Sequence, residues 1–398
     1  MTRTEWAGDV PEAGMRPRAL LLSGPLGLGH EMPLRSFRDQ LERSGWHVRA
    51  LDSMELLGTR ANRAGLRVFS GLMTVPGLYD GLHFAQLRTG GRVARMMDRA
   101  SARRVVPALR ADLARAPADL VLSVFATGAL AAASLKAEAP GRRTVVYCPD
   151  VAAHRLWVHE GTDLFLVSSP AAAASIRRFR PRAEIAVVPP PVRAVFYDAP
   201  SREKARETLR IPRDARCALM IDSGWGFAPL PDAAVVLAGA GVRVLAVAGR
   251  NAAAERRLRE VAAANTNVTA FGFTDQVPEL MAAADLVITL PGAATCAEAR
   301  VVGRRLLLLD VMPGHGRDNL LHELEQGGAG VCGPAAADVA ASALAMLDDD
   351  CEVDDCGDGD GDGEVPRAPR WEPAFAAALA RVGLPAEPRW EETCVPFS

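Results

Sequence analysis

Short, nearly continuous apolar runs alternate with longer stretches of helical periodicity along most of this chain. Such runs are expected of parallel strands, which are covered on both faces. Helical stretches such as residues 33–45 and 131–140 lie between them. The alternation predicts two α/β domains, each built on a doubly wound parallel sheet. The predicted strands lie within residues 18–24, 46–52, 118–126, 142–150, 163–169 and 183–192 of the first half, and within 217–224, 242–250, 267–273, 284–292 and 304–312 of the second.

Changes in composition divide the chain into segments. The start of the chain lacks the apolar core of a signal peptide, so we expect a disordered leader. Three prolines at 189–191 end a predicted strand, which places the link between the domains there. We therefore expect a leader at 1–17, an N-terminal domain at 18–196, a C-terminal domain at 197–347, an acidic linker at 348–370, and a C-terminal helix and tail at 371–398.

The acidic tract imitates the start of a calcium-binding loop. Asp358, Asp360 and Asp362, followed by Gly363, match the first half of an EF-hand. The carboxylate that closes such a loop at its twelfth position is absent, since Pro369 stands there. We expect a solvated acidic linker rather than a calcium site.

Length and charge restrict the class of protein. A chain of 398 residues is too long for one ordinary core, and its net charge of −2 predicts no general affinity for nucleic acid. No run approaches the roughly 18 apolar residues of a membrane span. The seven cysteines form no CxxC pair, which favours a reducing, cytoplasmic compartment.

One segment, residues 58–118, departs from this neutral average. It carries eleven arginines against three aspartates, together with an apolar stretch at 68–84 that we expect to be exposed. A solvated helical face is one interpretation. The other is a surface that rests on anionic lipid, where each basic residue contributes about 1 kcal/mol and apolar side chains enter the interface.

The turn after the first predicted strand is rich in glycine but fits neither common phosphate-binding motif. Gly24, Gly27 and Gly29 have the spacing GxxGxG, not GxGxxG, and no Lys-Ser/Thr pair follows as in a P-loop. His30 instead begins the next helix, at the edge of the sheet where α/β proteins bind ligands. A neutral imidazole there is suited to accept a proton, although a histidine that only caps the turn is the alternative.

The second half supplies a nucleotide-binding pattern. Gly224 and Gly226 follow its first strand, and Gly292, Ala293, Ala294 and Thr295 follow a later one. Backbone N–H groups at that helix N-terminus suit a diphosphate. Glu298, expected in the first turn of the helix, could accept hydrogen bonds from a ribose diol, or could simply stabilise the helix dipole.

Together these residues resemble a GT-B glycosyltransferase of the group that contains monogalactosyldiacylglycerol synthases, processive diacylglycerol glucosyltransferases and the lipid II N-acetylglucosaminyltransferase. The resemblance covers roughly residues 18–347. It rests on the order and spacing of GLGH at 27–30, YCPDVAAHRLW at 147–157, PPPVRAVF at 189–196, AGRN at 248–251 and FGFTDQVPELMAAADLVIT at 271–289.

The resemblance implies a GT-B fold, two Rossmann-like domains facing across a cleft, and an inverting transfer from a UDP-sugar to a lipid acceptor. The N-terminal domain would bind the acceptor and the C-terminal domain the donor, in a cytoplasmic enzyme peripheral to the inner face of the plasma membrane. The implied base is His30 or Asp150, with His154 in support. Donor contacts would come from Gly224, Gly226, Arg250, Phe273 (by the uracil), Gly292, Ala293, Ala294, Thr295, Glu298 (on the ribose) and Asn319.

Such enzymes generally need neither metal nor cofactor, because backbone donors and a helix dipole stabilise the leaving diphosphate. One loop departs from the group. Its PGQEExN, whose Gln and Glu grip sugar hydroxyls, is PGHGRDN here, with His315, Gly316 and Arg317 beside Asn319. The sugar is therefore not predicted, and two alternatives remain: a catalytically silent GT-B-like module that binds nucleotide or lipid, and a UDP-sugar 2-epimerase-like enzyme.

Overall fold

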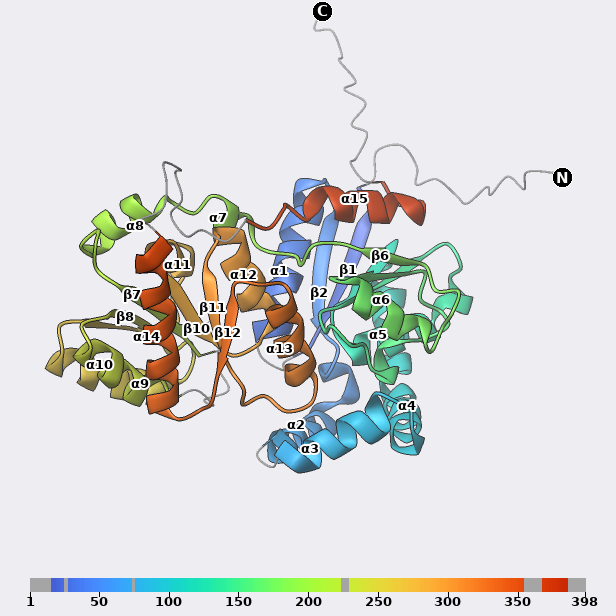
Figure 1. Cartoon of the computed structure of the whole chain (residues 1–398). Coiled ribbons are helices and arrows are strands. Elements are labelled where there is room, and N and C mark those ends of the chain that lie inside the picture. Colours follow the sequence, from blue (N-terminus) through green and yellow to red (C-terminus); the bar gives the residue numbers. More distant parts are fainter. Residues whose placement is uncertain (1–15, 25–27, 74–75, 223–228, 354–366, 386–398) are drawn as a thin grey trace, which may run out of the picture.

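The computed structural model describes residues 16–24, 28–73, 76–222, 229–353 and 367–385, and contains two six-stranded sheets in which every strand pairing is parallel (Figure 1). The prediction of two doubly wound α/β domains is confirmed. Each sheet is covered by helices, so its central strands are buried almost throughout, whereas strands at the sheet edges are partly exposed. The first sheet has the order β2-β1-β3-β4-β5-β6. Its strands are β1 (Arg18–Ser23), β2 (His47–Asp52), β3 (Leu120–Ser123), β4 (Arg143–Cys148), β5 (Leu164–Val167) and β6 (Ile185–Val187).

The second sheet has the order β12-β11-β10-β7-β8-β9. Five of its strands lie within predicted runs, but β12 was not predicted. That strand is short, has a glycine at its second position and lies half exposed at the sheet edge, so it lacks the apolar run by which buried strands are recognised. The strands are β7 (Cys217–Ile221), β8 (Arg243–Val247), β9 (Val268–Phe271), β10 (Leu286–Thr289), β11 (Arg305–Leu309) and β12 (Ala329–Cys332).

Helices connect successive strands in both halves, as the right-handed crossovers of parallel sheets require. In the first half they are α1 (Leu28–Arg43), α2 (Thr59–Met73), α3 (Pro76–Leu82), α4 (Arg92–Arg115), α5 (Ala126–Ser134) and α6 (Pro170–Arg177), with short turns η1 (Glu55–Leu57), η2 (His83–Leu87), η3 (Lys136–Glu138) and η4 (Arg155–Trp157). In the second half they are α7 (Ala194–Tyr197), α8 (Arg202–Leu209), α9 (Leu230–Gly239), α10 (Ala252–Ala264), α11 (Val277–Ala283), α12 (Ala293–Val302), α13 (His315–Glu325) and α14 (Ala336–Val353).

The last described helix, α15 (Glu372–Arg381), returns to the first domain (Figure 1). Trp371 and Phe375 are buried against Phe37 of α1, and the Trp371 Nε1–H donates to the Val192 carbonyl at 2.8 Å. The start of the acidic tract is helical, because α14 continues to Val353, beyond the boundary expected at residue 347. The EF-hand-like aspartates and the 1–15 part of the leader lie outside the described residues.

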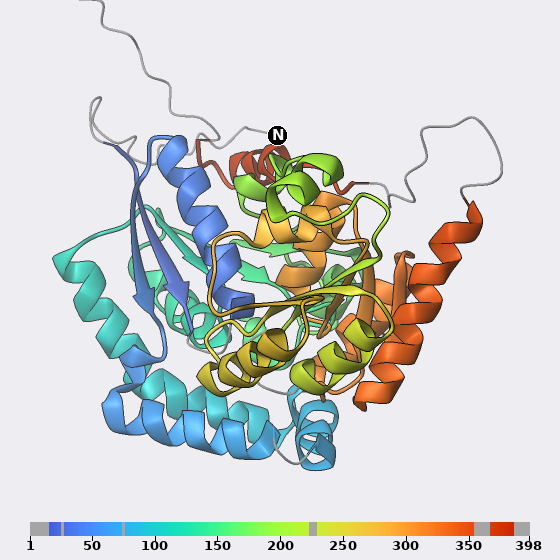
Figure 2. The same cartoon turned by 90° about the vertical axis from the view of Figure 1, so that its left-hand side faces the viewer.

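Helices α2, α3 and α4, with η2 between α3 and α4, lie below the first domain and reach α13 of the second; we call residues 59–115 the arm (Figures 1 and 2). The sequence predicted that the apolar side chains of the arm are exposed. The structure shows that only some of them are. Val68 and Leu78 are exposed, but Tyr79 and His83 are buried. Their burial has a specific cause: Tyr79 and His83 pack against the Gly314 turn of the second domain.

Candidate functional site

The first predicted catalytic residue lies at the N-terminus of α1. His30 is the third residue of this helix, and its Nδ1 lies 2.8 Å from the carbonyl oxygen of Val124. Because a carbonyl can only accept, Nδ1 carries the proton and the neutral ring keeps Nε2 as an acceptor. Burial lowers the pKa of His30, opposed by the negative charge of Asp150. The side chain is therefore suited to accept a proton near neutral pH.

Asp150, the rival base, follows β4 in the same domain, and its charge acts on the rings around it. His30 lies 6.2 Å from Trp157 between ring centroids, and Trp157 lies 6.0 Å from His154. Burial lowers the pKa of His154 to about 4, although Asp150 acts in the opposite direction. The structure thus groups His30, Asp150 and His154, three residues that the sequence had selected from two separate motifs.

Two further aromatic groups at this place, His83 and Tyr79, were not selected from the sequence. His83 of the arm lies 6.1 Å from His154 and 6.3 Å from His315, and stacks on Tyr79 at 5.9 Å. Both ring nitrogens of His83 are buried without a hydrogen-bond partner among the described residues. No local signal marks His83, because its neighbours come from another loop and another domain.

The predicted diphosphate seat is the N-terminus of α12. Gly292 is its N-cap and Ala293, Ala294 and Thr295 are its first three residues, all partly exposed. The first N–H groups of a helix have no partner within it, so these amides can bind an anion. The helix packs against α1, which brings this end of the second domain to the helix that carries His30.

We expected Glu298 in the first turn of α12. The structure instead places it as the sixth residue of this helix. It is only 7% exposed, and its Oε1 lies 3.5 Å from Nη2 of Arg193, in the link between the domains. Burial raises the pKa of Glu298 to about 7, while Arg193 opposes the shift. No pattern in the sequence indicates this pairing.

Arg250 and Phe273 meet at the edge of the second domain. The Arg250 guanidinium lies 4.9 Å from the centroid of the half-exposed Phe273 ring, a cation–π contact. It also donates to the carboxylate of Glu31, beside His30, at 3.2 and 3.4 Å. Arg250, which the sequence predicted to contact the UDP-sugar, therefore also bridges the two domains.

Asn319 of α13 is 5% exposed and links both sides of the site. Its Oδ1 accepts from the Val151 N–H at 3.3 Å, and its Nδ2 donates to the Pro291 carbonyl at 3.4 Å. One contact lies beside Asp150 and the other beside Gly292. The remaining predicted donor residues, Gly224 and Gly226, lie outside the described residues.

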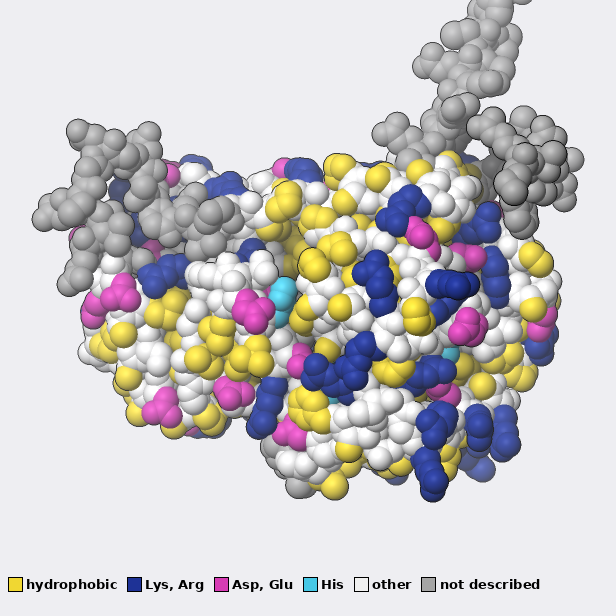
Figure 3. All heavy atoms as spheres, turned by 45° about the vertical axis from the view of Figure 1, so that its right-hand side comes forward, with side chains coloured by type: hydrophobic (Ala, Val, Ile, Leu, Met, Phe, Trp, Pro, Cys, Tyr) yellow, Lys and Arg dark blue, Asp and Glu magenta, His cyan; other side chains and the backbone are white. Residues whose placement is uncertain are grey.

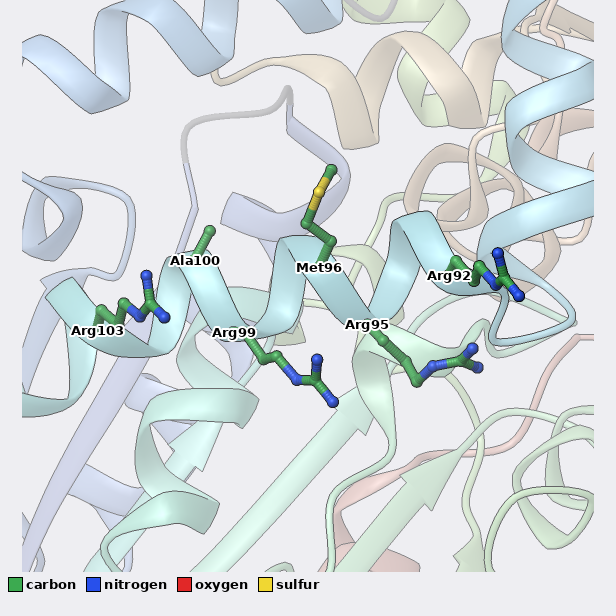
Figure 4. Close-up of a pocket in the computed structure, with 6 residues that line it drawn as sticks. All are labelled: Arg92, Arg95, Met96, Arg99, Ala100 and Arg103. Atoms are coloured by element: carbon green, nitrogen blue, oxygen red, sulfur yellow. The ribbon is translucent and has the colours of Figure 1, made fainter.

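The outer face of the arm is basic and apolar. Arg92, Arg95, Arg99 and Arg103 follow one another along α4 and, with Met96 and Ala100, line a hollow of about 520 Å³ (Figure 4). The view shows Arg95 and Arg99 along one edge of this face, and Met96 and Ala100 along the other. Met96 is 64% exposed. Figure 3 shows dark blue side chains interleaved with yellow ones over this part of the molecule.

Two features are absent from the described ranges. No helix there combines the length and apolar character needed to cross a bilayer. In the same residues, no group of three or more His, Cys, Asp or Glu is arranged to hold a metal ion.

The chain has two α/β domains, each built on a sheet of parallel strands, and the candidate groups lie on helices where the domains meet. This arrangement is that of the GT-B class. Residues 229–325 match the model of the glycosyltransferase family 28 C-terminal domain. The predicted resemblance to this group is confirmed by that match and by the relatives below.

Among curated proteins, a processive diacylglycerol β-glucosyltransferase from Bacillus licheniformis is 25% identical over 186 residues, which is 45% of this chain and 48% of that one. A probable chloroplastic monogalactosyldiacylglycerol synthase 2 from Oryza sativa subsp. indica is 28% identical over 189 residues, 45% and 40% of the two chains. The chain spans about half the length of the curated relatives it matches.

Among solved structures, Arabidopsis thaliana UGT89C1 complexed with UDP-L-rhamnose superimposes with a TM-score of 0.54 at 15% identity, covering 84% of this chain and 91% of that one. Likeness at this identity supports the GT-B fold alone.

Proposed function

We propose that this protein is an inverting glycosyltransferase that moves a sugar from a UDP-sugar to a lipid or lipid-like acceptor at a membrane surface. The observation that carries the proposal is the link that Asn319 makes across the domain boundary. Its amide joins the backbone beside Gly292, the N-cap of α12, to the backbone beside Asp150, whose charge acts on His30. The first amides of α12, those of residues 293–295, have no partner within the helix.

The donor half of the proposal uses the second domain. The α12 amides would bind the diphosphate, and their fixed dipoles would stabilise the charge that develops as UDP leaves, so that no metal or cofactor is required. Ionised Glu298 would accept hydrogen bonds from the ribose hydroxyls. Phe273 offers an exposed ring for the uracil, with Arg250 held against it.

The acceptor half uses the first domain. In an inverting displacement a base takes the proton of the acceptor hydroxyl as that oxygen attacks the anomeric carbon opposite the leaving UDP. His30 is our first choice, because its bond to Val124 orients the ring and leaves Nε2 unprotonated. Asp150 would stabilise the resulting imidazolium, or serve as the base itself.

The arm would bring the enzyme to its acceptor. Its row of arginines suits anionic headgroups, and Met96 and other exposed apolar groups suit the interface below them. On this basis we propose action at the inner face of the plasma membrane, on the cytoplasmic side. The diacylglycerol named for the relatives makes such lipids the first acceptors to test.

The test is release of UDP from a panel of UDP-sugars with diacylglycerol in anionic vesicles. We expect release that depends on acceptor and falls at least about a hundredfold in His30→Ala, the usual scale for loss of a general base. A matched variant, His47→Ala, changes an exposed histidine outside the site and should retain full rate. Full rates in His30→Ala would remove His30 from the mechanism, and conversion of the sugar without acceptor would favour the epimerase-like alternative.

One observation favours a second candidate, a catalytically silent module that binds nucleotide or lipid. The turn that carries sugar-gripping residues in the resembled group is bound here by the arm, with the Gly314 N–H bonded to Asp80. Binding of UDP-sugar without transfer to any acceptor of the panel would support this candidate. Measured transfer would reject it.

A further inference from the structure

The turn before α13 is where the arm meets the second domain. Gly314 is the N-cap of α13, and its N–H donates to Oδ1 of Asp80 in α3 at 2.6 Å. A carboxylate at a helix N-terminus satisfies a free N–H and complements the helix dipole. Here that carboxylate comes from the other domain, so the arm supplies the cap of α13.

Two ion pairs lie beside this hydrogen bond. The Arg88 Nη1 lies 2.9 and 3.1 Å from the two carboxylate oxygens of Asp318, whose side chain is largely buried. Arg317 lies 3.6 Å from Asp80 but is more than half exposed. Because exposed pairs contribute little, the Arg88–Asp318 pair is the stronger of the two links.

Close packing fixes the same contact. Gly314 has φ of +65°, and a Cβ there would lie 2.5 Å from the Tyr79 ring and 3.2 Å from His83. Only glycine adopts this backbone without strain and admits the two rings. Tyr79 and His83 are buried as a result, so the inner face of the arm is a domain interface.

Through α13 this contact reaches both sides of the proposed site. Asn319 lies one residue after Asp318, and its amide binds the backbone beside Asp150 and beside Gly292. Movement of α13 would break both bonds together. The arm therefore acts on the site through α13, in addition to the direct contact of His83 with the ring of His154.

We propose that Asp80 and Arg88 are positioning residues: the arm clasps α13 and thereby holds the two domains at the spacing that the bonds of Asn319 to the backbone beside Asp150 and beside Gly292 require. The catalytic consequence rests on the proposed function, whereas the clasp itself does not. Since the arm also carries the basic outer face, docking of that face on a membrane and closure of the domains involve the same helices.

The test is a charge-reversal cycle read by hydrogen–deuterium exchange. Arg88→Glu and Asp318→Arg each place like charges together, so we expect exchange of the amides of residues 314–319 to accelerate about tenfold. The double variant restores an opposite-charge pair and should return the rate toward that of the unaltered chain. Arg110→Glu, which breaks an ion pair with Glu138 inside the first domain, is the matched control and should leave these amides unchanged.

If charge reversal impairs folding, two milder variants of Asp80 provide a second test. Asp80→Asn retains an acceptor oxygen and should keep most of the protection, whereas Asp80→Ala should lose it. Single variants that exchange like the control, or a double variant no better protected than the singles, would overturn the clasp.

Activity separates this inference from the proposed function. If transfer occurs, clasp variants should lower kcat more than they raise KM for the UDP-sugar, and the double variant should recover kcat. If the unaltered protein transfers no sugar, the proposed function fails while the exchange data still decide the clasp.

Discussion

At the scale of single residues, the site combines groups that follow strands of the first domain with a carboxylate that is buried against the link between the domains. His30 and Asp150 could be selected because each follows a strand, and the carboxyl ends of parallel strands share one edge of the sheet. Arg193 could not be paired with Glu298, because a contact between a linker and a helix in the next domain leaves no periodic signal. The shifted pKa of Glu298 depends on that unpredicted burial.

We predict that affinity for a UDP-sugar rises with pH through this group. The pKa of Glu298 is about 7, and the ribose hydroxyls bind the ionised form. Between pH 6 and 8 the ionised fraction rises about tenfold, and affinity should follow it. Calorimetric titration with UDP-glucose, whose diphosphate does not titrate in this range, measures the effect.

The matched variant for this titration is Glu298→Gln, which keeps the shape of the side chain but not its charge. Its affinity should be weaker at pH 8 and nearly constant with pH. A pH dependence that survives in the variant would assign the titration to another group.

At the scale of elements, apolar runs predicted eleven of the twelve strands, because buried parallel strands have nearly continuous apolar sequences. The arm was predicted only as a basic segment. Which of its faces is exposed was not predictable, since Tyr79 and Leu78 have similar apolar character but only Tyr79 packs on the second domain.

We predict that the exposed face of α4 binds anionic vesicles. Arg92, Arg95 and Arg99 should contribute about 1 kcal/mol each, so replacing all three by Glu should weaken flotation with anionic vesicles more than about tenfold. The control is the same triple change at Arg256, Arg257 and Arg259 of α10. Equal losses in the two triple variants would reduce the effect to net charge, and no loss in either would leave the arm a solvated face.

A buried ion pair gives a stability prediction at the same scale. Arg206 of α8 is 1% exposed, and its Nη2 donates to both carboxylate oxygens of Asp285 at 2.7 and 2.8 Å. Arg202 also pairs with Asp285, so removing Arg206 leaves the carboxylate with one arginine and leaves the backbone carbonyls that Arg206 binds without this donor. Arg206→Leu should therefore lower the free energy of unfolding by about 2 kcal/mol. Urea denaturation measures this loss. Lys204→Ala, in an exposed pair on the same helix, should change the midpoint little, and a comparable shift there would contradict the interpretation.

At the scale of the whole molecule, the site is shared between domains, and the sequence predicted the two domains but not how they join. The bonds that join them, from Arg250 to Glu31 and from Asp80 to Gly314, span more than 200 residues. Shape and charge complementarity between distant surfaces sets such contacts, and no local pattern encodes it. The PGHGRDN loop departs in sequence from the group that the chain resembles. Its contact with the arm could not be predicted from that departure.

We predict that acid destabilises the folded chain, because His154 is held in its neutral form at the boundary between the two domains. Burial lowers the pKa of His154 to about 4 from an unfolded value near 6.5, so the unfolded chain binds more protons. This contribution to stability is complete above about pH 6.5 and is lost as the pH falls toward 4. Since the ring is partly exposed, we expect it to amount to about 2 kcal/mol.

Thermal denaturation of the unaltered chain and of His154→Phe between pH 7 and 4 measures this contribution. The variant should lose less stability than the unaltered chain over this interval. Identical slopes would mean that His154 is not buried in its neutral form.

We expect a nucleotide diphosphate to bind at the N-terminus of α12, at the boundary between the domains. The decisive measurement is a crystal structure of the protein with UDP. It should show diphosphate oxygens within hydrogen-bond distance of the amides of residues 293–295 and ribose hydroxyls on Glu298. A nucleotide bound in the first domain, or away from α12, would contradict it.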